Sequence, residues 1–312
     1  MATVLPQYSV DFWTLGSLPL GVGLEMALGG FKWKPGPNRP IPRLVELAEG
    51  GLRVASGRAG GGPRAERLAG DVLVVVVVGL VAGLAWPAVE LADGLGGPAS
   101  LVVRSTLIAC GLSFRRKGDE ILQAAEATDL ASARLAASEF AGSASTRMDF
   151  AAIRRAGVLA IGRRANRQAI APLTWLAIAG PVGLWSYQAI VTLRRMVVEG
   201  RPRHEDFGSP SARLDRLVNF LPERLTWLLI ALSAALLGED GGEALRRGRA
   251  EGRRQPKQDG AWGMAALLAA LGPNVSGTIG PGDVRRALRI ARVAALHALA
   301  LAFAYRVVIM GR

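Results

Sequence analysis

The chain contains 312 residues, of which 50% are hydrophobic and 20% are charged. This balance is too apolar for an ordinary soluble domain and indicates a membrane protein. The net charge of +13 is spread over every segment between the hydrophobic stretches instead of being concentrated on one domain with interleaved aromatics. We therefore interpret the basic residues as anchors at the membrane surface and expect no nucleic-acid partner.

The only cysteine, Cys110, excludes an internal disulfide framework and any metal site built from several cysteines. The first ten residues lack the basic segment of a cleavable signal peptide. We therefore expect the first hydrophobic stretch to remain in the mature protein.

Two hydrophobic stretches are long enough to cross a bilayer, whose hydrocarbon layer of about 30 Å requires roughly 20 helical residues. The first is residues 72–89, and the second is residues 168–193, a run of 26 uncharged residues bracketed by arginines. Three weaker candidates are residues 12–24, 225–238 and 293–309. We expect four or five spans in an all-α, polytopic membrane fold.

The first weak candidate is followed by Glu25, so it crosses the membrane only if that carboxyl is neutral, snorkelling or paired. The alternative for this stretch is an interfacial hairpin. Residues 261–282 contain an apolar part of only about a dozen residues, which favours a re-entrant or interfacial element over a crossing.

We expect residues 1–312 to form a single domain with an extramembrane helical region at residues 103–167. Helical spacing of Ala, Leu, Glu and Arg predicts two short amphipathic helices there, joined at Thr128–Asp129, and a third from about Asp149. The glycine-rich residues 56–67 and the basic residues 239–260 are interpreted as linkers.

The connection after the long middle span carries most of the candidate polar groups. Ser209 followed by Pro210 fits a helix N-cap with proline at the first helical position, so a helix is predicted to begin there. Asp215 and Asn219, four residues apart, would share one face of this helix. Pro222 should kink it before the apolar run resumes.

Upstream, His204, Glu205 and Asp206 offer imidazole and oxygen ligands suited to Mg²⁺ or to a phosphate-bearing substrate. The alternative is a solvated loop with ordinary charge pairs.

Several motifs, in this order, resemble the CobD/CbiB family of cobalamin biosynthesis membrane proteins: DLASAR, APLTW, YQAIVTL, DFG and ARLDRLVNFLPERLT. The resemblance runs from about residue 24 to the C-terminus, and the last block is its most specific part. It implies a protein similar to adenosylcobinamide-phosphate synthase, which joins the propionate carboxyl of adenosylcobyric acid to aminopropanol or its phosphate with ATP and Mg²⁺.

The resemblance also implies a corrinoid substrate, a multi-pass location in the inner or plasma membrane, and other corrin-pathway membrane proteins as candidate partners. Its phosphoryl chemistry needs cations for phosphates and carboxylates for a metal. On the matching positions we expect Asp206, Asp215 and Asn219 to be catalytic and Glu205 with Asp206 to hold the metal. The expected substrate-binding residues are Arg163, Arg164, Arg167, Arg194, Arg195 and Arg224.

The sequence departs from the family pattern at several polar positions. Arg163, Arg164 and Arg167 stand where the family has Glu, Asn and Asp, and Arg194 lies where its NTLDSM motif has Asp. A guanidinium in place of a carboxylate repels a divalent cation, but it can clamp a phosphate or a corrinoid carboxylate.

Three functions therefore stay open. The first is ligation, with ATP and Mg²⁺. The second is a non-catalytic membrane paralogue that binds an anionic corrinoid or a partner and needs no cofactor. An anion transporter ranks last, because the spans carry few polar residues besides Glu25, His297 and Arg306.

Overall fold

The computed structural model describes residues 12–28, 40–58, 62–112, 115–199, 205–255, 259–272 and 279–310. Every regular element in these ranges is a helix, which confirms the predicted all-α class. The α-helices are α1 (Phe12–Leu28), α2 (Pro40–Arg58), α3 (Pro63–Leu95), α4 (Gly97–Gly111), α5 (Arg115–Glu126), α6 (Leu130–Ala141), α7 (Phe150–Arg164), α8 (Ala171–Arg194), α9 (Glu205–Leu236), α10 (Gly241–Arg254), α11 (Ala261–Ala270) and α12 (Pro281–Met310).

Four helical stretches are long and apolar enough to cross a membrane. They are Pro63–Leu95, Phe150–Val198, Asp206–Leu236 and Pro281–Ile309. This number agrees with the predicted four or five spans and supports a polytopic membrane protein. The weak N-terminal candidate forms the 17-residue helix α1, which packs against α4, so the hairpin alternative is wrong.

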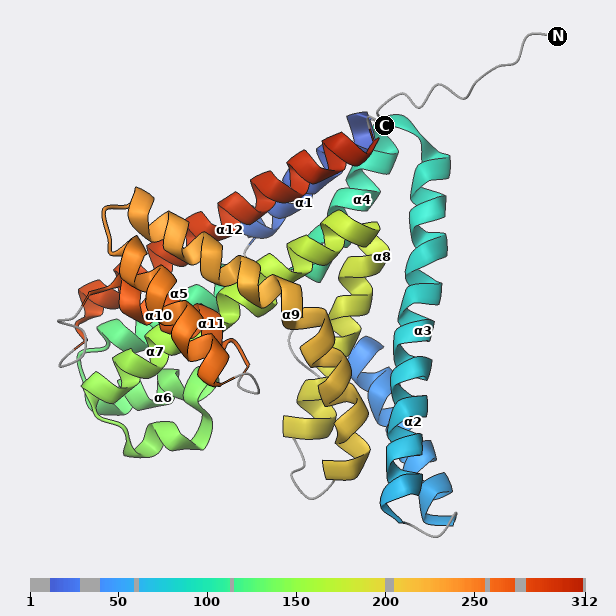
Figure 1. Ribbon diagram of the computed structural model, residues 1–312. Helices are drawn as coiled ribbons and strands as arrows, with labels where there is room; N and C mark the ends of the chain where they lie inside the picture. The colour runs from blue at the N-terminus through green and yellow to red at the C-terminus, as the bar shows by residue number, and fades with distance from the viewer. Residues whose placement is uncertain are drawn as a thin grey trace.

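The helices predicted in residues 103–167 form where the sequence places them. Their position outside the membrane stays a prediction, and α7 belongs to the candidate span Phe150–Val198. Asp129 caps α6 by accepting a hydrogen bond from the backbone N–H of Ser132 at 2.8 Å. Asp149 caps α7 in the same way, through the N–H of Ala152 at 2.7 Å. In Figure 1, α5, α6 and α7 lie together with α10 and α11 on one side of the molecule, away from α3.

The linker predicted at residues 239–260 is for most of its length the helix α10. Its glycines are packing positions, because a Cβ atom at Gly248 or Gly252 would overlap the indole of Trp227 or Trp262. The sequence prediction was wrong because it took glycine and arginine density as a sign of flexibility. The other predicted linker, residues 56–67, is also mostly helical, since α2 ends at Arg58 and α3 begins at Pro63.

Helix α9 begins at Glu205, four residues before the predicted N-cap Ser209. The buried ring of Phe207 accounts for the earlier start, because it packs into the cluster formed by α2 and α3 and lies 4.4 Å from the guanidinium carbon of Arg53. Pro222 lies inside the helix as predicted. Figure 1 shows the axis of α9 changing direction between its two halves.

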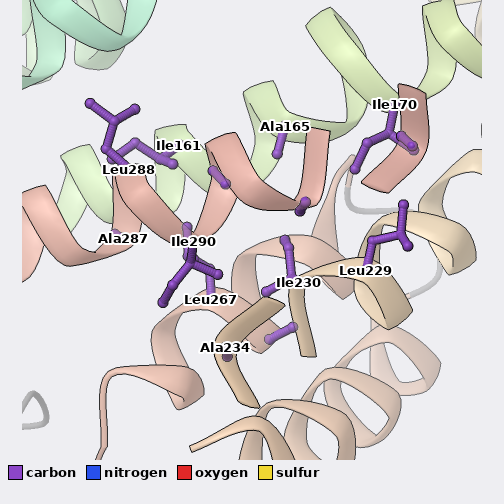
Figure 2. Packing of buried hydrophobic residues seen from close by; sticks show 14 of the residues in the cluster. Ile161, Ala165, Ile170, Leu229, Ile230, Ala234, Leu267, Ala287, Leu288 and Ile290 are labelled. Carbon is purple, nitrogen blue, oxygen red and sulfur yellow. The ribbon is translucent and has the colours of Figure 1, made fainter. Parts of the chain in front are cut away.

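Two large hydrophobic clusters, and a small third one around Ala124, Ala133, Ala137 and Ile153, hold the helices together. The largest joins α7, α9, α11 and α12, and Figure 2 shows Ile161, Leu229, Leu267 and Ile290 converging from these four helices. Its many alanines allow helices to approach closely, as in membrane proteins generally. The second cluster joins α2, α3, the end of α8 and the start of α9.

Candidate functional site

A buried ionic cluster lies on the first half of α9, between the two large hydrophobic clusters. At its centre is Asp215, whose side chain is 1% exposed. Arg167 donates to both carboxylate oxygens, from Nη1 to Oδ1 at 3.1 Å and from Nη2 to Oδ2 at 2.7 Å. Arg194 adds a third hydrogen bond to Oδ2 at 2.5 Å. A carboxylate this deeply buried is tolerated because charged donors satisfy it on several sides.

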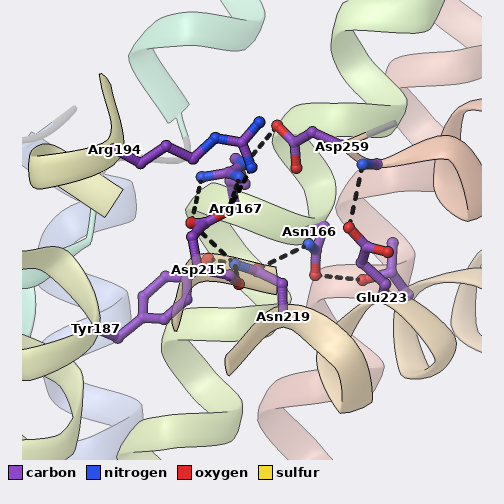
Figure 3. A network of polar contacts seen from close by, with 10 residues as sticks. Asn166, Arg167, Tyr187, Arg194, Asp215, Asn219, Glu223 and Asp259 are labelled. Atoms are coloured by element: carbon purple, nitrogen blue, oxygen red, sulfur yellow. Dashed lines mark hydrogen bonds and ion pairs between the residues drawn. The ribbon is translucent and has the colours of Figure 1, made fainter. Parts of the chain in front are cut away.

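A chain of neutral hydrogen bonds extends from this ion pair into the protein (Figure 3). The side-chain amide of Asn219 donates to the backbone carbonyl of Asp215 at 2.8 Å and to its Oδ1 at 3.2 Å. Asn219 Oδ1 accepts from the hydroxyl of Tyr187 at 2.9 Å and from the amide of Asn166 at 3.1 Å. Thr226 closes the chain by donating to Asn166 Oδ1 at 3.1 Å. These contacts fix the orientation of the side-chain amides of Asn166 and Asn219.

A second carboxylate reaches the cluster from the segment just before α11. Asp259 Oδ2 lies 2.6 Å from Arg167 Nε, although the contact lacks the alignment of a hydrogen bond. The next residue, Gly260, has a φ of 72° and donates its backbone N–H to Glu223 Oε1 at 3.2 Å. A left-handed φ is readily adopted by glycine, so Gly260 allows the sharp turn that directs Asp259 toward Arg167.

Local helix distortions lie next to both arginines. Residues Ala165–Ile170, which carry Asn166 and Arg167, form a π-helical turn, and a second one, Arg195–Glu199, follows Arg194 directly. π-Turns are often found at functional sites because the extra residue rotates neighbouring side chains onto a new face. The two π-turns flank α8 at both ends. One contains Arg167 and the other lies next to Arg194, and both arginines bind the carboxylate of Asp215.

The structure brings together four of the residues singled out in the sequence: Arg167, Arg194, Asp215 and Asn219. Asp206 lies apart from them and pairs instead with Arg67, with Nη2 and Oδ1 2.8 Å apart. Asp206 and Asp215 are nine residues apart on one helix, which corresponds to about 13 Å along its axis.

The other predicted arginines do not point into the cluster's hydrogen-bond network. Arg195 is exposed. Arg164 lies toward α6, with its guanidinium carbon 6.0 Å from the ring of Phe140. Arg224 stacks on Phe220, at 3.5 Å, and faces Trp262. The backbone of Arg163 lies against Gly260, where a Cβ atom would come within 3.1 Å of the Arg163 Cα.

The predicted metal site at Glu205 and Asp206 stays a prediction, because only Asp206 has a described side chain. No group of three or more His, Cys, Asp or Glu side chains comes together among the described residues. Asp206 is already paired with an arginine. Glu205 begins α9 but its side chain, like the whole of His204, lies outside the described residues.

Sequence reasoning missed Asn166, Tyr187, Thr226 and Asp259 as members of the cluster. Asp259 was interpreted as part of a basic linker. A polar residue inside a predicted span can indicate a functional site. Tyr187 lies inside the predicted span at residues 168–193, whereas Asn166 lies two residues before it. For Asp259 no local signal exists, because only the fold brings α11 next to α7.

The cluster is close to electrically neutral, with two arginines against Asp215 and Asp259. Within it, Arg194 Nε and Asp259 Oδ1 are buried and have no hydrogen-bond partner. Unsatisfied buried polar atoms are rare in native proteins and often mark a place for water or a ligand. Arg194 Nε is a donor that a bound anion can satisfy, whereas Asp259 Oδ1 is an acceptor that water or another donor can satisfy.

The CobD/Cbib protein family matches residues 18–280. The chain belongs to the CobD/CbiB family. It is 32% identical to the cobalamin biosynthesis protein CobD of Klebsiella pneumoniae, over 92% of this chain and 96% of the relative. It is 31% identical to the cobalamin biosynthesis protein CbiB of Salmonella choleraesuis, over 91% of this chain and 94% of the relative.

A CobD of Pelobacter propionicus is 32% identical over 83% of this chain and 79% of the relative. No solved structure matches the chain. The CobD/CbiB match covers the whole ionic cluster, from Asn166 to Asp259.

Proposed function

We propose that this protein acts in cobalamin biosynthesis by an amide ligation similar to that of adenosylcobinamide-phosphate synthase. The reaction would join the carboxyl of adenosylcobyric acid to aminopropanol or its phosphate, in the inner or plasma membrane, with the four long helices as membrane crossings. Membership of the CobD/CbiB family supports the pathway. The observation that supports an anionic substrate is the convergence of Arg167 and Arg194 within one cluster.

Arg194 and Arg167 are the groups suited to hold a substrate carboxylate or phosphate. Their side chains are 17% and 12% exposed, whereas Asp215 is 1% exposed and both of its oxygens accept hydrogen bonds. Asp215 and Asn219 therefore act as positioning residues that hold the arginines, and not as groups that touch the substrate. An anion that reached Arg167 would compete with Asp259 for the guanidinium.

Magnesium does not fit Asp206, Asp215 or Asp259. Asp215 is paired with two arginines, Asp259 with one and Asp206 with another, so a divalent cation would face positive charge at each of them. We therefore assign no step to a protein-bound metal. Guanidinium groups do suit the phosphates of ATP.

A non-catalytic membrane paralogue that binds an anionic corrinoid is the second candidate. The observation that favours it is the internal neutralisation of both buried carboxylates by arginines. Such a protein would bind adenosylcobyric acid without converting it.

An activity assay separates the two candidates. Purified protein in detergent is incubated with adenosylcobyric acid, aminopropanol phosphate, ATP and Mg²⁺, and the amide product is measured by mass spectrometry. Arg194→Gln should reduce product formation at least tenfold, whereas Arg195→Gln, at the exposed neighbouring position, should change it less than twofold.

The Salmonella choleraesuis relative is assayed in parallel under the same conditions. If the relative forms product and this protein does not, ligation is rejected. Salt-sensitive binding of adenosylcobyric acid in that case supports the paralogue, and loss of both activity and binding rejects both candidates.

A further inference from the structure

A groove separate from the ionic cluster runs between α7, α10 and α11. It encloses about 490 Å³, which is in the range of pockets that hold small organic ligands. Figure 1 shows these three helices grouped on the side of the molecule away from α3. Ala261, two residues after Asp259 of the cluster, is one of the residues that line the groove.

The floor of the groove is apolar. On α11 it is lined by Met264, Ala265 and Leu268, which are half-buried and lie on one face of the helix. Leu159 of α7 extends this surface. Helix α11 has no polar side chain besides the indole of Trp262, so the floor offers a ligand an apolar surface and no charged or amide partner.

The rim of the groove is basic and its charges face each other from two helices. Arg155 comes from α7, and Arg247 and Arg254, about two helical turns apart, come from the opposite wall, α10. Glu251 is the one acidic residue in the lining. Arg247 already pairs with Glu243 on its own helix, whereas the ionic contacts found among the described residues include none for Arg155 or Arg254.

We propose that this groove binds a phosphate monoester that carries an apolar group. A phosphate monoester has a charge of about −1.5 to −2 at neutral pH, which suits Arg155 and Arg254, the two arginines of the rim without an ionic contact among the described residues. Its oxygens can accept hydrogen bonds from guanidinium groups on both walls, while the apolar part covers the floor. The phosphate can come from a soluble small molecule or from the headgroup of phosphatidic acid.

Binding is tested on the full-length protein with 1-naphthyl phosphate as the soluble probe. Inorganic phosphate lacks the apolar group and 1-naphthol lacks the phosphate. Each is therefore expected to bind at least tenfold more weakly than 1-naphthyl phosphate. Nanodiscs that contain phosphatidic acid are compared with nanodiscs of phosphatidylcholine alone, with Trp fluorescence or calorimetry as the readout. Competition between phosphatidic acid and 1-naphthyl phosphate identifies the lipid as a natural source of the phosphate, whereas the absence of competition assigns the groove to soluble monoesters.

The variants compare groove arginines with a matched arginine outside the groove. Arg155→Gln and Arg254→Gln should each weaken binding of 1-naphthyl phosphate about fivefold to tenfold. Arg253→Gln, in the same last turn of α10 but outside the lining, should change it less than twofold. Ala265→Trp should block the naphthyl group and leave the weak binding of inorganic phosphate unchanged.

The inference does not depend on the proposed ligation. If no amide forms but 1-naphthyl phosphate binds with this pattern, the groove assignment stands. Equal effects of Arg253→Gln and Arg254→Gln, or no binding of either phosphate source at millimolar concentration, would overturn it.

Discussion

The indole nitrogen of Trp175 donates a hydrogen bond to the backbone carbonyl of Val218 at 3.1 Å. Val218 lies four residues before Pro222, which has no N–H to donate to that carbonyl. The side chain from α8 therefore replaces the hydrogen bond that α9 loses at its proline. This contact joins the two helices that carry Arg194 and Asp215.

The first prediction concerns this replacement. Trp175→Phe keeps most of the ring but removes the donor, so it should reduce the free energy of unfolding by about 1 kcal/mol. In a Pro222→Ala background the helix regains its own donor, and Trp175→Phe should then cost much less. Thermal unfolding of the four proteins in detergent gives the double-mutant cycle. Equal costs in both backgrounds would contradict the explanation.

Removing the carboxylate of the buried ion pair should cost far more stability than removing the carboxylate of the exposed pair on the same helix. Asp215→Asn leaves Arg194 buried without a negative partner and Arg167 with Asp259 alone, so it should destabilise the fold by about 3 kcal/mol. Asp206→Asn breaks a pair whose members are 53% and 33% exposed, and it should cost less than about 1 kcal/mol. Denaturant titration of both variants measures the difference. Similar values for the two would show that Asp215 is not the ionic centre described here.

Close approach of α3 and α9 gives a third prediction. A Cβ atom at Gly70 would overlap the carbonyl oxygen of Phe207, whereas one at Gly79 of the same helix would meet nothing within 4 Å. Gly70→Ala should therefore destabilise the protein by about 1–3 kcal/mol. Gly79→Ala, the matched control, should leave stability unchanged or slightly higher. Both are measured by thermal unfolding in detergent, and a harmless Gly70→Ala would argue against this helix contact.

A fourth prediction concerns acid sensitivity at the end of α9. Hydrogen bonds from Arg286 lower the pKa of Glu239, which lies outside the spanning stretches. A carboxyl whose pKa is lowered by folding stabilises the protein above its unfolded pKa of about 4.3, and this stabilisation is lost as the pH falls through the folded value. Thermal unfolding midpoints between pH 7 and pH 3 should fall more steeply for the native protein than for Glu239→Gln. If the unfolding midpoints of the two proteins fall equally with pH, Glu239 does not contribute to the acid sensitivity.

Much of the fold could be predicted from local sequence properties. The stretch at residues 168–193 is recognisable as part of a candidate span from its length and its lack of charge alone. The structure divides this run into two helical segments, because the backbone at Ala179 and Gly180 is not helical. Asp129 and Asp149 mark helix starts because an N-cap acts on backbone groups only two or three residues away. Helix α10 was missed, because its glycines owe their role to Trp227 and Trp262, which no local pattern connects to them.

The sequence by itself determined that this chain is an all-helical membrane protein of the CobD/CbiB type with arginines at unusual positions, since hydropathy, caps and motifs are properties of neighbouring residues. Only the tertiary structure decided which charges meet. Arg167 pairs with Asp215 and Asp259, 48 and 92 residues further along the chain, and Asp206 pairs with Arg67 instead of joining them. A charge can be buried only beside a partner, and the packing of distant helices selects that partner.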